Sequence, residues 1–155
     1  MTEIVNLLEC AAAEDGRARD GHRFLRTMIG QTVDAKLTGF SLYELPPGES
    51  AWAYHYELSR EEWLIVVDGE VVVRTPAGDR ALGAGDVVCF PVGEAGAHQV
   101  RNVSSSAARF AMPSSWSGEG YVAIRPDSNT AVINGPGFRQ IVPLDDDLDY
   151  WDREP

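Results

Sequence analysis

Four side chains that can bind a divalent metal ion lie in two short stretches of the chain. His55 and Glu57 are two positions apart, Glu62 follows them closely, and His98 lies in a later stretch. Successive side chains of a β-strand point to opposite faces, so His55 and Glu57 share one face of a strand. A return strand that begins near Glu62 brings a third ligand opposite them, and His98 can supply the fourth. We therefore expect one metal site built from His55, Glu57, Glu62 and His98.

This set of donors limits both the ion and its chemistry. Two imidazoles and two carboxylates balance a divalent charge, and the mixed nitrogen and oxygen donors suit one ion of Fe(II), Mn(II), Ni(II) or Zn(II). If Glu57 swings away, a set of two histidines and one carboxylate remains, which is the arrangement of oxygen-activating non-haem iron. Glu57 is then available as a catalytic base. The alternative is a protein of the same shape that binds no ion.

The elements that must position these side chains are short strands. Apolar runs separated by turn residues extend from Thr38 to Met112, a pattern typical of an all-β sandwich or barrel. The turn segments supply the fixed or positive φ that tight connections require, and they are residues 46–48, 68–69, 76–79 and 83–86. The expected strands are 50–58, 63–67, 71–75, 79–82, 87–90, 97–102, 107–112 and 121–124.

The two ends of the chain differ from its middle. Residues 1–35 are rich in arginine and show no strong periodicity, so we expect an N-terminal arm with one short helix or strand. Residues 36–125 are the expected barrel, and residues 126–155 are an expected acidic C-terminal arm. With 155 residues the chain has the usual size of a single domain, which includes both arms.

The two stretches that carry the metal-binding side chains resemble the two motifs of the cupin superfamily. The first motif, G-x5-HxH-x3,4-E-x6-G, is similar to the stretch from Gly48 to Gly69. The second, G-x5-PxG-x2-H-x3-N, is similar to the stretch from Gly85 to Asn102. The resemblance implies an all-β fold, the double-stranded β-helix or jelly roll of the cupin barrel, with one divalent metal ion inside. It implies a structural role for Asn102.

Three positions depart from the superfamily pattern. Two loops are longer, between Gly48 and His55 and between Gly93 and His98, and Glu57 stands where the second histidine belongs. The last departure alters the metal chemistry. Over most of its length the chain also resembles small single-domain cupins of bacteria, some of which are called sugar-phosphate isomerases by analogy. The segments that carry this resemblance are residues 43–48, 61–63, 85–91 and 149–151.

The outer faces of the expected strands are unusually apolar. If His55 and Glu57 point inward, then Trp52, Tyr54 and Tyr56 point outward, as do Trp63, Ile65 and Val67 on the next strand. An antiparallel sheet with one wet face should alternate apolar with polar residues, so these strands require a cover. A second subunit or the two arms can provide it, and we expect a homodimer.

Charge and composition exclude several classes of partner and location. The formal net charge of −11 repels phosphate backbones and anionic lipid surfaces, so we expect neither nucleic acid nor membranes as partners. No apolar run approaches the roughly 20 residues of a membrane-spanning helix. The first residues do not resemble a secretory signal, so we expect a cytoplasmic protein in which Cys10 and Cys89 are free thiols.

Three functions agree with these observations. The first is a metal-dependent enzyme that acts on a small metabolite by dioxygenase, isomerase or lyase chemistry. The second is a non-catalytic cupin that binds a small molecule or acts as a sensor. The third, a sugar-phosphate isomerase, needs basic residues to hold phosphate, and the candidates on the barrel strands are Arg74, Arg101 and Arg109.

Overall fold

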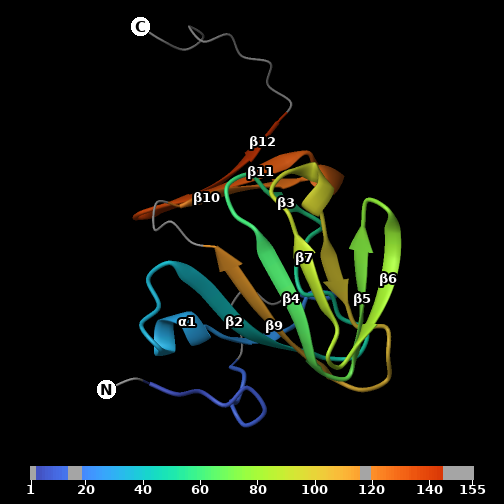
Figure 1. Ribbon diagram of the computed structural model, residues 1–155. Helices are drawn as coiled ribbons and strands as arrows, with labels where there is room; N and C mark the ends of the chain where they lie inside the picture. The colour runs from blue at the N-terminus through green and yellow to red at the C-terminus, as the bar shows by residue number, and fades with distance from the viewer. Residues whose placement is uncertain (1–2, 14–18, 116–119, 145–155) are drawn as a thin grey trace, which may run out of the picture.

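The computed structural model describes residues 3–13, 19–115 and 120–144, and this part of the chain contains twelve β-strands in three antiparallel sheets (Figure 1). In spatial order, the first sheet contains β1 (Leu25–Thr27), β2 (Thr38–Leu45), β9 (Ala108–Ser115), β4 (Glu62–Asp68) and β7 (Val87–Phe90). The second contains β12 (Phe138–Pro143), β11 (Thr130–Gly135), β10 (Tyr121–Arg125) and β3 (Tyr56–Glu57). The third contains β6 (Gly78–Gly83), β5 (Glu70–Thr75) and β8 (Gln99–Arg101). The helical segments are α1 (Ile29–Thr32), η1 (Glu94–Gly96) and η2 (Pro126–Ser128).

Strand β4 shows how the apolar pattern builds the interior. Leu64 and Val66 are buried in the main core, together with Phe110 of β9. Because side chains alternate along a strand, Glu62 shares the inner face with Leu64 and Val66. The turn into β5 depends on Gly69, which has a φ of 75° and lies against the backbone of β9. A side chain at this position would combine backbone strain with a close contact, so the turn favours glycine.

The opposite face of β4 is partly covered by the N-terminal part of the chain. Ile65 and Val67 pack against a second apolar cluster centred on Ile29 of α1, Leu42 of β2 and Ala111 of β9. Val5, Leu7 and Cys10 from the N-terminal segment join this cluster. The arm at residues 3–13 and the outer face of β4 therefore pack against the same apolar cluster.

The expected strand at 50–58 is largely wrong. Only Tyr56–Glu57 form β3, while Ser50 and His55 make isolated bridges. Because residues 50–54 are not regularly extended, their side chains do not alternate between faces. Trp52, expected on the outside, packs against the main core with its ring centroid 4.7 Å from that of Tyr43. Tyr54, also expected outside, is buried beneath the guanidinium of Arg74.

The other expected strands are confirmed as β4, β5, β6, β7, β8, β9 and β10, with small shifts at their ends. Three strands were not expected. Strand β2 lies at the start of the apolar region, and the β11–β12 hairpin lies within residues 126–155, where we expected an acidic arm. The acidic run at 145–155 falls outside the described residues. No helix among the described residues has the length and apolar character required to cross a bilayer.

Figure 1 shows how the sheets are arranged around the interior. The second sheet lies at the top of the view, above one end of β4 and β9, and the N-terminal segment lies at the lower left beside α1 and β2. Strand β3 joins the second sheet through Ala123 and Ile124 of β10. The loop with His55 therefore lies beside the second sheet, which contains the β11–β12 hairpin. This sheet forms part of the surroundings of the candidate site.

Candidate metal centre

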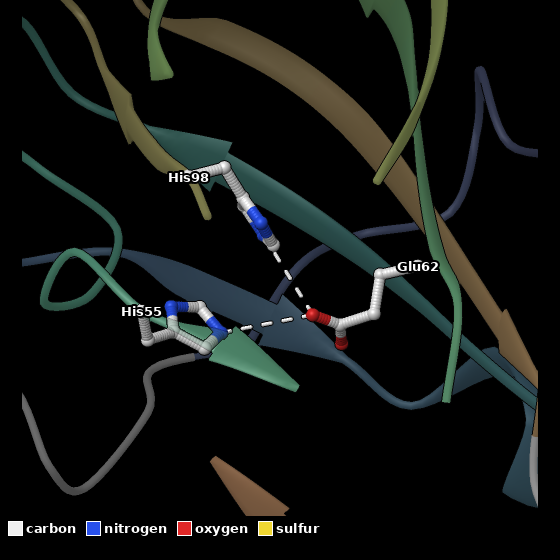
Figure 2. Close-up of side chains that lie close together, drawn as sticks. All are labelled: His55, Glu62 and His98. Carbon is white, nitrogen blue, oxygen red and sulfur yellow. Dashed lines mark ion pairs between the residues drawn. The ribbon is translucent and has the colours of Figure 1, made fainter. Parts of the chain in front are cut away.

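A pair of backbone hydrogen bonds brings the two histidines together. The His55 N–H donates to the His98 carbonyl at 3.1 Å, and the His98 N–H donates to the His55 carbonyl at 2.8 Å. Their ring centroids are 4.7 Å apart. Glu62, the first residue of β4, faces both rings from the neighbouring sheet (Figure 2). Three expected metal-binding residues, far apart in the sequence, are therefore close in space.

Both imidazoles are held in one orientation. The Nδ1 atom of His55 lies 2.9 Å from the Ala53 carbonyl, and that of His98 lies 2.9 Å from the Gly96 carbonyl. A carbonyl accepts only, so each Nδ1 carries the proton and each Nε2 keeps a lone pair. Phe90 stacks on the His98 ring at 3.7 Å between centroids, which fixes the ring further. Histidines that bind metal ions commonly have such partners at the second nitrogen.

The free ends of the three side chains converge on one point. The Nε2 atoms of His55 and His98 each lie 3.6 Å from Oε2 of Glu62. All three potential ligand atoms lie within 4.8 Å of one another. Donor atoms about 2.0–2.2 Å from one ion are separated by roughly 3–4 Å, so the spacing fits a shared cation. Two nitrogens and one carboxylate oxygen are donors that Fe(II), Mn(II), Ni(II) and Zn(II) accept.

Two of these atoms lack any other partner in the described part of the chain. His98 Nε2 and Glu62 Oε2 are buried, and neither makes a hydrogen bond there. An uncompensated buried polar atom destabilises a fold by about 1–3 kcal/mol, so such atoms commonly mark a functional site. A cation between them would compensate both. The residues present therefore fit a divalent metal ion.

The charge states of the site also suit a cation. Burial acts to raise the pKa of Glu62, but its interactions with His55, Arg60 and His98 outweigh burial and lower this pKa to about 2. Burial, helped by the neighbouring His55, lowers the pKa of His98 to about 4. At neutral pH Glu62 is therefore ionised and His98 is neutral. These are the protonation states that bind a metal ion.

Glu57 lies beside this group of three rather than within it. Its side chain is buried at 4% exposure, and Oε1 lies 3.9 Å from His55 Nε2. The same Oε1 accepts a hydrogen bond from Arg60 Nη2 at 2.7 Å, whereas Oε2 is buried without a hydrogen bond to any described residue. Burial raises the pKa of Glu57, and Arg60 acts in the opposite direction. Glu57 thus has one oxygen held in place and one available.

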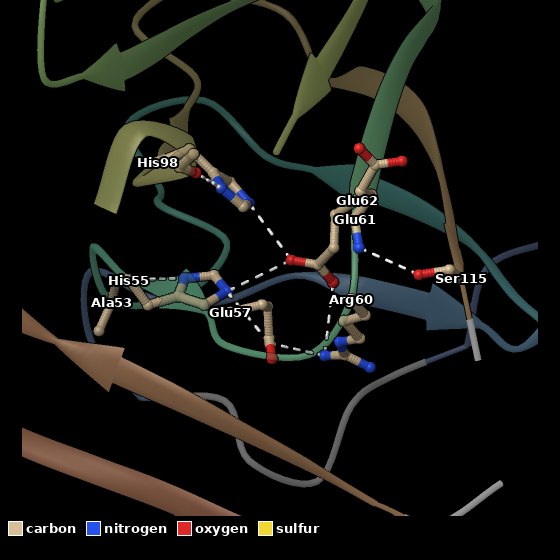
Figure 3. Close-up of polar contacts among 9 residues, drawn as sticks. Ala53, His55, Glu57, Arg60, Glu61, Glu62, His98 and Ser115 are labelled. Carbon is tan, nitrogen blue, oxygen red and sulfur yellow. Dashed lines mark hydrogen bonds and ion pairs between the residues drawn. The ribbon is translucent and has the colours of Figure 1, made fainter. Parts of the chain in front are cut away.

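Arg60, which was not expected in the site, contacts both of its carboxylates. Its Nη2 atom also lies 3.4 Å from Glu62 Oε1 (Figure 3). Its guanidinium lies 3.8 Å from the centre of the Tyr121 ring. Glu57 and Glu62 together raise the pKa of Arg60, against the effect of burial. The signal in the sequence was an arginine between two carboxylates that we expected to be metal ligands. Its guanidinium compensates part of the negative charge of the two carboxylates.

A cavity of about 930 Å³ opens from this centre. Its lining includes His55, Glu57, Arg60 and Glu62, together with residues of β2, of the stretch 19–35 and of one face of the second sheet. This volume is within the range of small-molecule sites. The molecule can therefore admit a metabolite next to the three potential ligands.

The basic residues that we expected to hold phosphate lie elsewhere. Arg74 pairs with Asp127, Arg101 pairs with Asp79, and Arg109 donates to backbone carbonyls of the N-terminal segment. None of the three lines the cavity. The arginines that do line it come from other segments, and they are Arg19, Arg26, Arg60, Arg125 and Arg139. Asn102 is buried, and its amide donates to the Leu45 and Ser106 carbonyls, so it is structural.

Residues 41–113 match the family model described as "Cupin domain". No curated protein matches the chain. Among solved structures, a candidate sugar phosphate isomerase from Acidithiobacillus ferrooxidans has a TM-score of 0.81 at 19% identity, over 92% of this chain and 91% of the other. A sugar phosphate isomerase of the cupin superfamily from Silicibacter pomeroyi has a TM-score of 0.78 at 21% identity, over 92% and 94%. A predicted oxalate decarboxylase from Thermotoga maritima has a TM-score of 0.60 at 22% identity, over 74% and 99%. These likenesses establish the double-stranded β-helix fold.

Proposed function

We propose that this chain, whose residues 41–113 match the cupin-domain model, binds one divalent metal ion and acts as a metal-dependent enzyme on a small metabolite. His55, Glu62 and His98 would hold the ion. The observation that carries the proposal is the pair of buried atoms, His98 Nε2 and Glu62 Oε2, that face each other without a hydrogen-bond partner among the described residues. The ion is Fe(II), Mn(II), Ni(II) or Zn(II).

A bound ion supplies a Lewis acid or an oxygen-activating centre, and the chain supplies a base. Glu57 is suited to this role because burial raises the pKa of its carboxyl above the usual value, which makes the carboxylate a better proton acceptor. Arg60 fixes Oε1 of Glu57, so Oε2 is the atom that accepts a proton from a molecule in the cavity. We keep Glu57 as the base rather than as a fourth ligand because it lies outside the group of three potential ligand residues.

Several reaction types use these parts. A base beside a metal ion suits isomerases and lyases, which move a proton, and the two-histidine, one-carboxylate set suits dioxygenases. The isomerase type is supported by two structural neighbours that are named as sugar phosphate isomerases and align with 92% of this chain. A non-catalytic cupin that binds a small molecule in the same cavity is the alternative. Turnover of a substrate by the metal-loaded protein separates the two.

The proposal extends to a cytoplasmic homodimer. The net charge of −11 favours a protein that binds neither nucleic acid nor membranes. Two features support the dimer. Trp63 is 42% exposed and Val87 is 53% exposed. Both lie on the outer face shared by β4 and β7, on which Ile65 and Val67 pack against the second apolar cluster. A second copy would shield the remaining apolar surface.

Elemental analysis of protein purified without a metal-affinity tag tests the metal proposal. We expect about one ion per chain in the wild type and less than about a tenth in His98→Ala. Glu61→Gln is the matched control for Glu62→Gln, because Glu61 is adjacent but exposed and outside the group of three. Glu62→Gln should lose the ion and Glu61→Gln should keep it. Wild-type protein that stays below a tenth of an ion after soaking in each of the four metals refutes the proposal.

A further inference from the structure

One face of the second sheet forms a wall of the cavity that leads outward from the metal centre. Tyr121 of β10 pairs with Asn134 of β11, which in turn pairs with Arg139 of β12. Directly paired residues of antiparallel strands point to the same face, and all three residues line the cavity. They form a row across the sheet, with neighbouring strands about 4.8 Å apart.

This row begins at the metal centre. Arg60 contacts the carboxylates of Glu57 and Glu62, and its guanidinium covers the ring of Tyr121. From Tyr121 the row continues through Asn134 to Arg139, which is exposed at the rim of the cavity. A molecule that lies along the row would therefore have one end beside Glu57 and Glu62 and the other end beside Arg139.

Charge is distributed unevenly along the cavity. Its only carboxylates in the described part of the chain are Glu57 and Glu62, both at the inner end and both in contact with Arg60. The rest of the lining holds four further arginines, namely Arg19, Arg26, Arg125 and Arg139. In a chain with a net charge of −11, an arginine-lined hollow is a local exception. A cleft with walls of one charge attracts ligands of the opposite charge.

Arg139 is the arginine best placed to hold an anion. Arg125 donates from Nε to the Thr130 hydroxyl at 2.9 Å, which gives it a role in the hairpin. Arg139 makes no ion pair with any residue that the structure describes, and its direct neighbour Asn134 offers an amide that can donate. A guanidinium beside an amide donor matches the oxygens of a phosphate or a carboxylate.

We infer that the substrate is a small metabolite with an anionic group, a phosphate or a carboxylate, held by Arg139 and Asn134 at the rim of the cavity. Its opposite end, which bears oxygen, faces His55, Glu62 and His98. This inference rests on the proposed function of the same site, because it names the class of substrate that the metal centre would act on.

Isothermal titration calorimetry tests the inference with inorganic phosphate, glucose 6-phosphate, gluconate and glucose as probes. We expect glucose 6-phosphate or gluconate to bind at least about tenfold more tightly than glucose. Preference for glucose 6-phosphate and inorganic phosphate identifies the anion as a phosphate, and preference for gluconate identifies it as a carboxylate. If no anionic probe binds more tightly than glucose, the inference is wrong.

Substitution of Arg139 identifies the residue that holds the anion. Arg139→Gln should weaken binding of the preferred anion at least about tenfold and change binding of glucose less than twofold, whereas Arg139→Lys should restore part of the loss. Arg80→Gln, which removes the same charge from exposed strand β6, should leave binding unchanged. Wild-type affinity in Arg139→Gln overturns the assignment.

Metal analysis of the same samples separates this inference from the proposed function. If the wild type contains no ion but its anion binding depends on Arg139, the anion subsite stands and the metal-dependent function fails. If the wild type and Arg139→Gln both contain the ion and bind the anion equally well, the metal centre stands and the anion subsite fails. Thermal unfolding of each variant shows whether a loss of binding reflects a loss of fold.

Discussion

His55 and His98 exchange a pair of backbone hydrogen bonds, which places their imidazole rings 4.7 Å apart at centroids with both Nε2 atoms towards Glu62. The relationship is built into the backbone rather than into flexible side chains. Each ring is also tied through Nδ1 to the carbonyl two residues before it. The geometry of the two nitrogens is therefore set before any ion arrives, which reduces the cost of ordering on binding.

Substitution of Glu57 should separate its proposed role as a base from a role as a ligand. We expect Glu57→Gln to retain the ion and to lower turnover of a substrate by about 10²–10⁴-fold, because the amide cannot accept the proton. Glu57→His should also retain the ion and shift the preference towards metals that favour nitrogen. Metal content and turnover are measured on the same preparation. Loss of the ion in Glu57→Gln would instead make Glu57 a ligand.

Acid should destabilise the metal-free protein through His98. Its pKa in the folded state is lowered from 6.5 to about 4, so between these values the unfolded chain binds a proton that the folded chain does not. Stability from this group is complete above about pH 6.5 and falls by on the order of 3 kcal/mol as the pH drops towards 4. Glu62, lowered from 4.5 to about 2, extends the loss in the same direction at lower pH.

Urea unfolding of EDTA-treated protein at several pH values measures this dependence. His98→Gln removes the titrating group, so its free energy of unfolding should vary less between pH 6.5 and 4 than that of the wild type. Equal slopes in the two proteins over this range would contradict the lowered pKa of His98.

Removal of Arg60 should raise metal affinity while lowering the stability of the metal-free protein. Arg60 contacts both Glu57 and Glu62, so Arg60→Gln leaves two buried carboxylates without their cation. An ion would then meet less competing positive charge, and we expect its dissociation constant to fall by about tenfold. Competition with a metal-binding dye measures affinity, and thermal unfolding measures stability. Weaker metal binding in Arg60→Gln would show that Arg60 serves mainly to position Glu62.

A charged residue at position 63 should disrupt the proposed dimer. Trp63 is largely exposed on β4, so Trp63→Glu should yield a folded monomer, whereas the wild type should be a dimer by light scattering at micromolar concentration. Phe138→Glu, which alters an exposed residue of β12 on another sheet, is the control. A monodisperse wild-type monomer refutes the dimer.

The residue types and their spacing were enough to predict the all-β fold and three side chains that come together. The all-β fold follows from local rules, since the alternation of side chains places Glu62 on the inner face with Leu64 and Val66, and turn residues mark where strands end. The segment from Ser50 to Tyr54 was mispredicted because its apolar residues resemble a strand but its backbone makes only isolated bridges. The β11–β12 hairpin was missed because most of its second strand is exposed and carries little apolar pattern.

What the amino-acid order could not reveal depends on contacts between distant segments. The position of Glu57 outside the group of three follows from Arg60, and the anionic preference that we infer for the cavity follows from arginines on the N-terminal segment and on β10 and β12. No periodicity within one segment encodes which residue of another segment it will face. Cross-strand register and the packing of one sheet over the end of another determine these contacts. Both arise only when the chain folds.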